Sequence, residues 1–182
     1  MSSDLDKAQN HWTWRRRGAV FADLRLPGGD LDADRFLAAR STSGPSSADL
    51  GHLERLRRIL AGLPPAERVY APLAAGGHVD HRLTRRAAEA VFGRRLEYYE
   101  DYPYVRSRVV LVKALGFSLW RPRTVELETA DLDAKVRAFG CFASQLSTAF
   151  ADPEDMKRQV RVFFERRGRH KAGGERLWRR LL

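Results

Sequence analysis

A buried strand, a double glycine and an amphipathic helix follow one another between residues 68 and 93, and this succession constrains the fold more than any other stretch. Residues 68–73 read as a short strand, because the run is mostly apolar and its only proline stands at the exit. In the helix that follows, the apolar residues share one face and Gly93 is a natural stop. Those apolar residues are Leu83, Ala87, Ala90 and Val91. The stretch therefore predicts a strand, a tight turn and a covering helix.

The segments on either side of this stretch alternate in the same way. The pattern predicts a strand at 19–26, a short helix at 32–39, a helix at about 50–63 and a strand at 96–99. Helices and strands that alternate over short connections are typical of a parallel sheet covered by helices. We therefore predict an α/β fold with a partial Rossmann-like parallel sheet, in which ligands bind outside the carboxyl ends of the strands.

The second half of the chain is predicted to be mainly helical. We expect helices at 105–115, 132–150 and from 153 onwards, an edge strand at 124–127, and a last amphipathic turn at 175–182. The 132–150 helix is predicted from apolar residues at alternating four- and three-residue spacings. Residues 19–182 are expected to form one domain with this helical C-terminal portion. Residues 1–18, which show no clean period, are expected to form an N-terminal arm.

The composition is that of a globular protein in a reducing compartment. Of the 182 residues 43% are apolar, enough for a real core, and no uninterrupted apolar run reaches the length of about 18 residues that a membrane span needs. The N-terminus lacks the basic start and apolar stretch of a secretory signal. Cys141 is the only cysteine, which excludes an internal disulfide and a cysteine-built zinc site. We therefore expect a cytoplasmic protein.

The net charge of +10 admits nucleic acid, an acidic membrane surface or an anionic substrate as a partner. The basic residues are nevertheless spread along the whole chain, as on solvated helix faces. A nucleic-acid surface is therefore the less favoured hypothesis, and it would require an affinity that falls steeply as salt rises.

Two histidines and an aspartate fall within four residues at the predicted turn after the strand 68–73. His78 and His81, three residues apart at the entry to a helix, can face one point, and Asp80 can orient one ring. Catalytic zinc takes about three protein ligands, so one such turn supplies at most two. The alternative is a plain helix start, with Asp80 as N-cap and both histidines as solvent-facing loop residues.

A second acidic pair follows the next predicted strand. Glu100 and Asp101 could support a site at the neighbouring strand end, or could equally cap a turn. The tyrosines around them, at 98, 99, 102 and 104, are expected to belong to the core. His52 and His170 are expected at the surface, because neither has a spacing that makes it a ligand.

Several segments taken together resemble one enzyme family. Tyr70-Ala71-Pro72-Leu73 followed by Gly76-Gly77-His78-Val79-Asp80-His81-Arg82 resembles the second signature of the PIG-L (LmbE-like) de-N-acetylases. The segment 98–104 is similar to the tyrosine-rich segment of a bacterial branch of that family, as are Lys135, Ser144-Gln145 and Glu175-Arg176-Leu177-Trp178. The resemblance covers roughly residues 20–182.

The resemblance implies a zinc-dependent amidase on a Rossmann-like sheet, which removes N-acetyl groups from N-acetylglucosamine-type sugars or glycoconjugates. By that resemblance His81 would be a zinc ligand. His78 would act on the reacting carbonyl oxygen or the leaving amine, and Asp80 would hold His78 in orientation. Zinc in such a site activates water and polarises the carbonyl, while a positioned histidine handles the proton.

The sequence departs from the family in one respect. The family's first signature, His-Pro-Asp-Asp, supplies the remaining ligands and the general base, and the 182 residues contain no such segment. We therefore expect a PIG-L-like domain that is incomplete at its N-terminus. The alternative is a non-catalytic remnant that serves as a binding or assembly module. A missing front would expose a sheet edge or apolar surface, and self-association is then expected.

Overall fold

The computed structural model describes residues 12–16, 19–23, 47–141 and 149–181, with side chains described from residue 50 onwards within these ranges. The predicted helix at 32–39 and the second half of the predicted 132–150 helix lie outside the described residues. The chain divides into two compact units. One comprises residues 1–120 and 179–182, and the other comprises residues 121–178.

The first unit carries four neighbouring strands in the order β1-β2-β3-β4. Their bounds are β1 Trp12–Arg16, β2 Ala19–Asp23, β3 Arg68–Pro72 and β4 Leu96–Tyr99. β2, β3 and β4 run parallel, and β1 lies antiparallel to β2. The predicted parallel α/β sheet is therefore confirmed. β1 falls in a segment where the sequence predicted no element.

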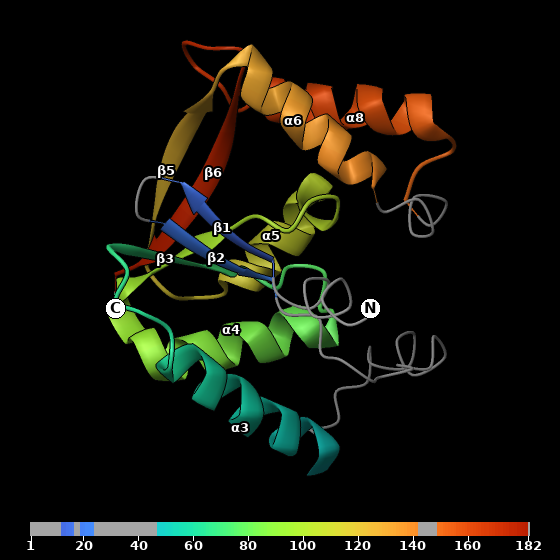
Figure 1. The fold of residues 1–182 in the computed structure, drawn as a ribbon. Helices are drawn as coiled ribbons and strands as arrows, with labels where there is room; N and C mark the ends of the chain where they lie inside the picture. The colour runs from blue at the N-terminus through green and yellow to red at the C-terminus, as the bar shows by residue number, and fades with distance from the viewer. Residues whose placement is uncertain (1–11, 17–18, 24–46, 142–148, 182) are drawn as a thin grey trace, which may run out of the picture. The chain divides into compact units, whose positions relative to one another are not determined.

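Helices cover this sheet and connect its strands. α4 (Val79–Phe92) packs against β3 and β4, and α3 (Ser47–Ala61) packs against α4, as Figure 1 shows. All of β3 except Arg68 is buried, as expected of a strand inside a covered parallel sheet. The 3₁₀ turns η1 (Gly93–Arg95) and η2 (Tyr104–Arg106) and the helix α5 (Arg108–Leu115) also belong to this unit. α5 confirms the helix predicted at 105–115.

The register of β3 and β4 brings their exits together. Pro72 pairs with Tyr99, and the next residue, Leu73, donates its backbone N–H to the Tyr99 carbonyl at 2.9 Å. The segments 74–78 and 100–104 therefore leave the sheet side by side at its carboxyl edge. This is the edge at which the sequence predicted a ligand site.

In its described residues, the second unit contains two helices and two strands. α6 (Thr129–Gly140) and α8 (Pro153–Glu165) lie side by side, and β5 (Trp120–Leu127) pairs with β6 (Gly173–Arg180). α8 begins as predicted, because the Asp152 carboxylate accepts the Asp155 backbone N–H at 2.7 Å. Lys135 on α6 forms an ion pair with Glu175 on β6, with Nζ 3.2 Å from Oε1.

The amphipathic turn predicted at 175–182 was wrong, because residues 173–180 form a strand. This strand begins with two glycines, Gly173 and Gly174. A Cβ on Gly174 would lie 2.6 Å from the carbonyl oxygen of Arg167, so the strand runs against backbone in a way that only glycine permits. Among the described residues, no helix combines the length and apolar character that crossing a membrane requires.

Candidate active site

A tight turn delivers the histidine cluster from the end of β3 to the start of α4. Ala74 and Gly77 both adopt positive φ angles, of 57° and 73°, and the Gly77 N–H is donated to the Ala74 carbonyl at 3.1 Å. Glycine adopts this conformation without strain, which accounts for Gly77. The helix begins at Val79 with His78 in the N-cap position. The alternative prediction that Asp80 caps the helix was therefore wrong, since Asp80 lies in its first turn.

The two histidines of the cluster lie close to one another. The ring centroids of His78 and His81 are 5.7 Å apart, with the ring planes tilted by 41°. One histidine stands at the helix start and the other on its first turn, so the three-residue spacing brings both rings to the same side of the turn. Asp80 lies between them in the sequence, and its negative charge opposes the lowering of the His78 pKa by burial and by the charge of His81.

Asp101 contacts His81 from the neighbouring strand exit. Its Oδ1 lies 2.8 Å from Nδ1 of His81, and its side chain is 0% exposed. Its other oxygen accepts the backbone N–H of Ala75 at 2.9 Å. One buried carboxylate therefore joins the turn after β3, the first turn of α4 and the exit of β4. Glu100, the other predicted acid, is buried beside it.

His78 is held from the same segment by Tyr104. The Tyr104 hydroxyl and Nε2 of His78 form a hydrogen bond, and the two ring centroids are 4.8 Å apart. Burial, followed by the charge of His81, lowers the pKa of His78 against the opposing effects of Asp80 and Asp101. Burial and the charge of Asp101 raise the pKa of Tyr104.

The predicted core role of the tyrosines is therefore divided. Tyr98 is 3% exposed and belongs to the core, whereas Tyr104 is 36% exposed and contacts the histidines. Sequence reasoning missed Tyr104 as a site residue. The available signal was its position five residues beyond the end of β4, in the segment that faces the turn after β3.

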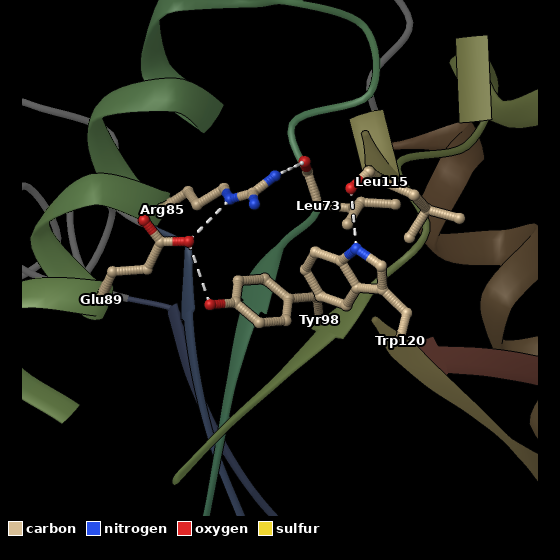
Figure 2. Close-up of polar contacts among 6 residues, drawn as sticks. All are labelled: Leu73, Arg85, Glu89, Tyr98, Leu115 and Trp120. Atoms are coloured by element: carbon tan, nitrogen blue, oxygen red, sulfur yellow. Dashed lines mark hydrogen bonds and ion pairs between the residues drawn. The ribbon is translucent and has the colours of Figure 1, made fainter. Parts of the chain in front are cut away.

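A network of polar contacts holds the exit of β3 next to the site. Arg85 on α4 donates one N–H to the Leu73 carbonyl at 2.7 Å and another to Glu89 at 3.0 Å, as Figure 2 shows. The Tyr98 hydroxyl donates to the same Glu89 oxygen at 3.0 Å. Burial, together with the charge of Glu89, raises the pKa of Tyr98, so its hydroxyl remains a donor.

Two aromatic rings pack against this network. The Arg85 guanidinium lies 5.1 Å from the Tyr98 ring centroid and 5.8 Å from that of Trp120, within the range of cation–π attraction. Trp120 in turn donates its indole N–H to the Leu115 carbonyl at 2.7 Å (Figure 2). Leu73, the last residue before the histidine turn, is thus held by α4 as well as by β4. The sequence did not predict this network.

The predicted zinc site requires metal ligands that lie close together. In the described ranges, no three or more histidine, cysteine, aspartate or glutamate side chains are grouped so that they could hold a metal ion. His52 and His170 are exposed, as predicted. Because catalytic zinc takes about three protein ligands, the described residues do not by themselves fit such a site.

The fold is similar to those of several proteins with solved structures. No family model matches the chain, and no curated protein matches it in sequence. Solved structures do match in fold, at sequence identities of 18–20%.

One match is a triple mutant of a deacetylase (Orf2*T) of the teicoplanin biosynthetic pathway, with a TM-score of 0.56, 20% identity and coverage of 75% of this chain. A second is the A40926 pseudoaglycone deacetylase Dbv21, with a TM-score of 0.56, 18% identity and coverage of 90% of this chain and 84% of its own. A third is the zinc inhibited form of the teicoplanin deacetylase Orf2, with a TM-score of 0.53, 20% identity and coverage of 91% of this chain. The chain spans 59% of the length of the first and third of these structures.

Proposed function

We propose that this chain carries part of the active site of a PIG-L-like de-N-acetylase, which hydrolyses the N-acetyl amide of an N-acetylglucosamine-type sugar or glycoconjugate. The observation that carries the proposal is the His78–His81 pair at the carboxyl edge of the sheet, with a buried aspartate 2.8 Å from His81. The likeness to deacetylase folds and the family resemblance of the segments 70–82 and 98–104 support the same assignment.

In this proposal His81 is a metal ligand that Asp101 orients. Metal-binding histidines usually donate their other ring N–H to a carboxylate or carbonyl, which fixes the ring and its tautomer. Nδ1 of His81 faces Asp101, so a metal would be bound through Nε2. The proposed metal is zinc, and its remaining ligands would come from outside the described residues. In the family that the sequence resembles, the His-Pro-Asp-Asp segment supplies these ligands.

His78 is proposed to handle the proton of the reaction. Amide hydrolysis requires that the leaving nitrogen gain a proton, and a histidine within hydrogen-bond reach can deliver it. Burial and the charge of His81 lower the pKa of His78, while Asp80 and Asp101 oppose them. The role of Asp80 as the orienting partner of His78 stays a prediction from the resemblance.

The test is acetate release by two forms of the protein. The 182-residue chain and a version extended at its N-terminus by a His-Pro-Asp-Asp-containing segment are incubated with an N-acetylglucosaminyl substrate and with an N-acetylated glycopeptide. Zinc is titrated over a wide range, because one of the matching structures is named as a zinc inhibited form. We expect release by the extended form. His81→Ala should abolish it, whereas His52→Ala, on an exposed helix position, should leave it unchanged.

The result that would refute this proposal is an extended form that is folded yet releases no acetate from either substrate at any zinc concentration.

A non-catalytic binding or assembly module is the second candidate. It is favoured by the described residues, which offer two neighbouring histidines without a third ligand grouped with them. This reading predicts a folded chain that retains no stoichiometric zinc after gel filtration, whereas retention of one zinc per chain would contradict it.

A further inference from the structure

The Tyr104 side chain occupies a position that the proposed function does not explain. Its hydroxyl bonds to Nε2 of His78, and its ring stands 6.5 Å from that of His81, almost at right angles to it. The Tyr104 ring therefore contacts both histidines of the cluster.

Gly76 provides the space in which this ring lies. A Cβ built on Gly76 would be 2.4, 2.6 and 2.7 Å from three ring carbons of Tyr104, and real Cβ atoms do not approach so closely. The neighbouring Gly77 differs, because a Cβ there would meet nothing within 4 Å and glycine is favoured only by its φ of +73°. The double glycine thus combines two separate requirements, one for the ring and one for the turn.

The backbone that carries Tyr104 is itself tied to Asp101. The Val105 N–H is donated to the Asp101 carbonyl at 3.3 Å, and Val105 is buried. A single short segment therefore contacts both histidines, through the Asp101 carboxylate at His81 and through the Tyr104 hydroxyl at His78.

We propose that Tyr104 is a positioning residue, whose hydroxyl donates to Nε2 of His78 and holds that ring in one orientation with its proton on Nδ1. Gly76 is required because any side chain there would displace the phenol. A phenolic oxygen keeps acceptor capacity while it donates, so the pair can still receive a hydrogen bond from a substrate. The catalytic meaning of the pair rests on the proposed function; the pairing itself does not.

The first test is spectroscopic and uses the full 182-residue protein. Nitrogen-15 spectra of labelled histidine side chains at about pH 8, where an unperturbed imidazole is neutral, separate the two tautomers of each ring. We expect the His78 ring to show a protonated Nδ1 and a hydrogen-bonded Nε2. Tyr104→Phe, which removes one oxygen and keeps the ring, should shift the Nε2 resonance and mix the tautomers.

Matched glycine variants test the requirement for space. Gly76→Ala should reproduce the effect of Tyr104→Phe on His78, whereas Gly77→Ala should strain the turn and leave the His78 tautomer as it is. In a Tyr104→Ala background, Gly76→Ala should have no further effect on His78, because the two changes then act on the same contact. If Gly76→Ala does not fold, Tyr104→Phe carries the decision alone.

Kinetics of the extended, active form give the second readout. Tyr104→Phe is expected to lower kcat about tenfold with little change in KM, because a histidine held less well loses part of its acid–base contribution. Unchanged His78 resonances in folded Tyr104→Phe would overturn the proposal. An extended form without activity would instead refute the proposed function and leave the spectroscopic result to decide on the pair.

Discussion

At the scale of single residues, Asp101 has the greatest structural effect in the site. A buried carboxylate is costly unless polar groups compensate its charge. In Asp101 one oxygen accepts the Ala75 backbone N–H at 2.9 Å, and the other lies 2.8 Å from Nδ1 of His81. The partners lie on separate segments, Ala75 on the turn after β3 and His81 on α4. Asp101 therefore contributes both to the stability of the sheet edge and to the orientation of a histidine.

Asp101→Asn should show both contributions. The amide keeps the shape but places an N–H₂ group or a weaker acceptor against His81, so the free energy of unfolding is expected to fall by about 1–3 kcal/mol. Urea denaturation measures this change. Asp133→Asn is the matched control, since the ion pair of Asp133 with Arg161 is partly exposed and its loss should cost about 0.5 kcal/mol or less. Equal losses in the two variants would contradict the argument.

Sequence reasoning reached part of this site and stopped for an identifiable reason. The strand-end rule predicted that His78 and His81 lie at a candidate site, and it left two roles open for Asp101, support of that site or the cap of a turn, because these residues follow apolar runs that read as parallel strands. The contact between Gly76 and Tyr104 links positions 28 residues apart, and it depends on how far the Tyr104 ring lies from the Gly76 backbone. No local sequence pattern predicts that distance.

At the scale of elements, Arg85 couples helix α4 to the exit of strand β3. Its planar guanidinium donates in two directions at once, to the Leu73 carbonyl and to the Glu89 carboxylate, which a lysine cannot reproduce. Arg85→Lys is therefore expected to lower the free energy of unfolding by about 1–2 kcal/mol while it keeps the charge.

The neighbouring Arg86 is the control for this variant, because it is exposed on the same helix. Arg86→Lys should change the stability by less than about 0.5 kcal/mol. Chemical denaturation of both variants gives the comparison, and a loss of equal size in each would mean that Arg85 does not fix the strand exit.

The strand β6 gives a second prediction at this scale. Gly174→Ala would bring a Cβ to 2.6–2.8 Å from backbone atoms of Arg167 and Gly168, so the strand or the preceding turn must shift. We expect a loss of about 1–3 kcal/mol, as for other overpacked sites. Gly51→Ala on α3 meets nothing within 4 Å and should stabilise the protein by about 0.5–1 kcal/mol, measured by thermal unfolding. Two changes of the same sign would contradict this reading.

The elements that the sequence predicted well are those with a strong local period. The end of α4 and both ends of β4 were placed within a residue of their bounds, because apolar spacing, Gly93 and the following apolar run all agree. β6 was misread, because Leu177 and Leu181 fit a helical turn as well as they fit a strand, and only the sheet decides between these. β1 was missed because its pairing with β2 lies in no local pattern.

At the scale of the molecule, α5 and the turn after it carry exposed apolar side chains at their surface. None of the residues of α5 is buried, and large apolar side chains of the helix and of the turn after it are exposed. These are Val109, Val112, Phe117 and Leu119. Soluble monomers rarely expose such residues together, so self-association, which the sequence also led us to expect, stays a prediction with this surface as its site.

Phe117→Ser with Val112→Ser should reduce that association. We expect the apparent mass of the wild-type chain by light scattering to rise with protein concentration, and the double variant to show a smaller rise, because the apolar area available for burial is lower. Leu50→Ser on α3 is a control for the loss of an exposed leucine elsewhere. A wild-type chain of constant monomeric mass would contradict the prediction.

Because Pro72 pairs with Tyr99, the geometry of the candidate site depends on the register between β3 and β4. A slip of β4 by one residue would turn its side chains to the opposite face, and a slip by two would move Asp101 by about 6.6 Å along the sheet. Either displacement exceeds what a 2.8 Å contact with His81 can absorb. The NMR resonances of the His81 ring should therefore report whether β3 and β4 of a refolded or redesigned chain pair in the native register. This readout requires no enzymatic activity.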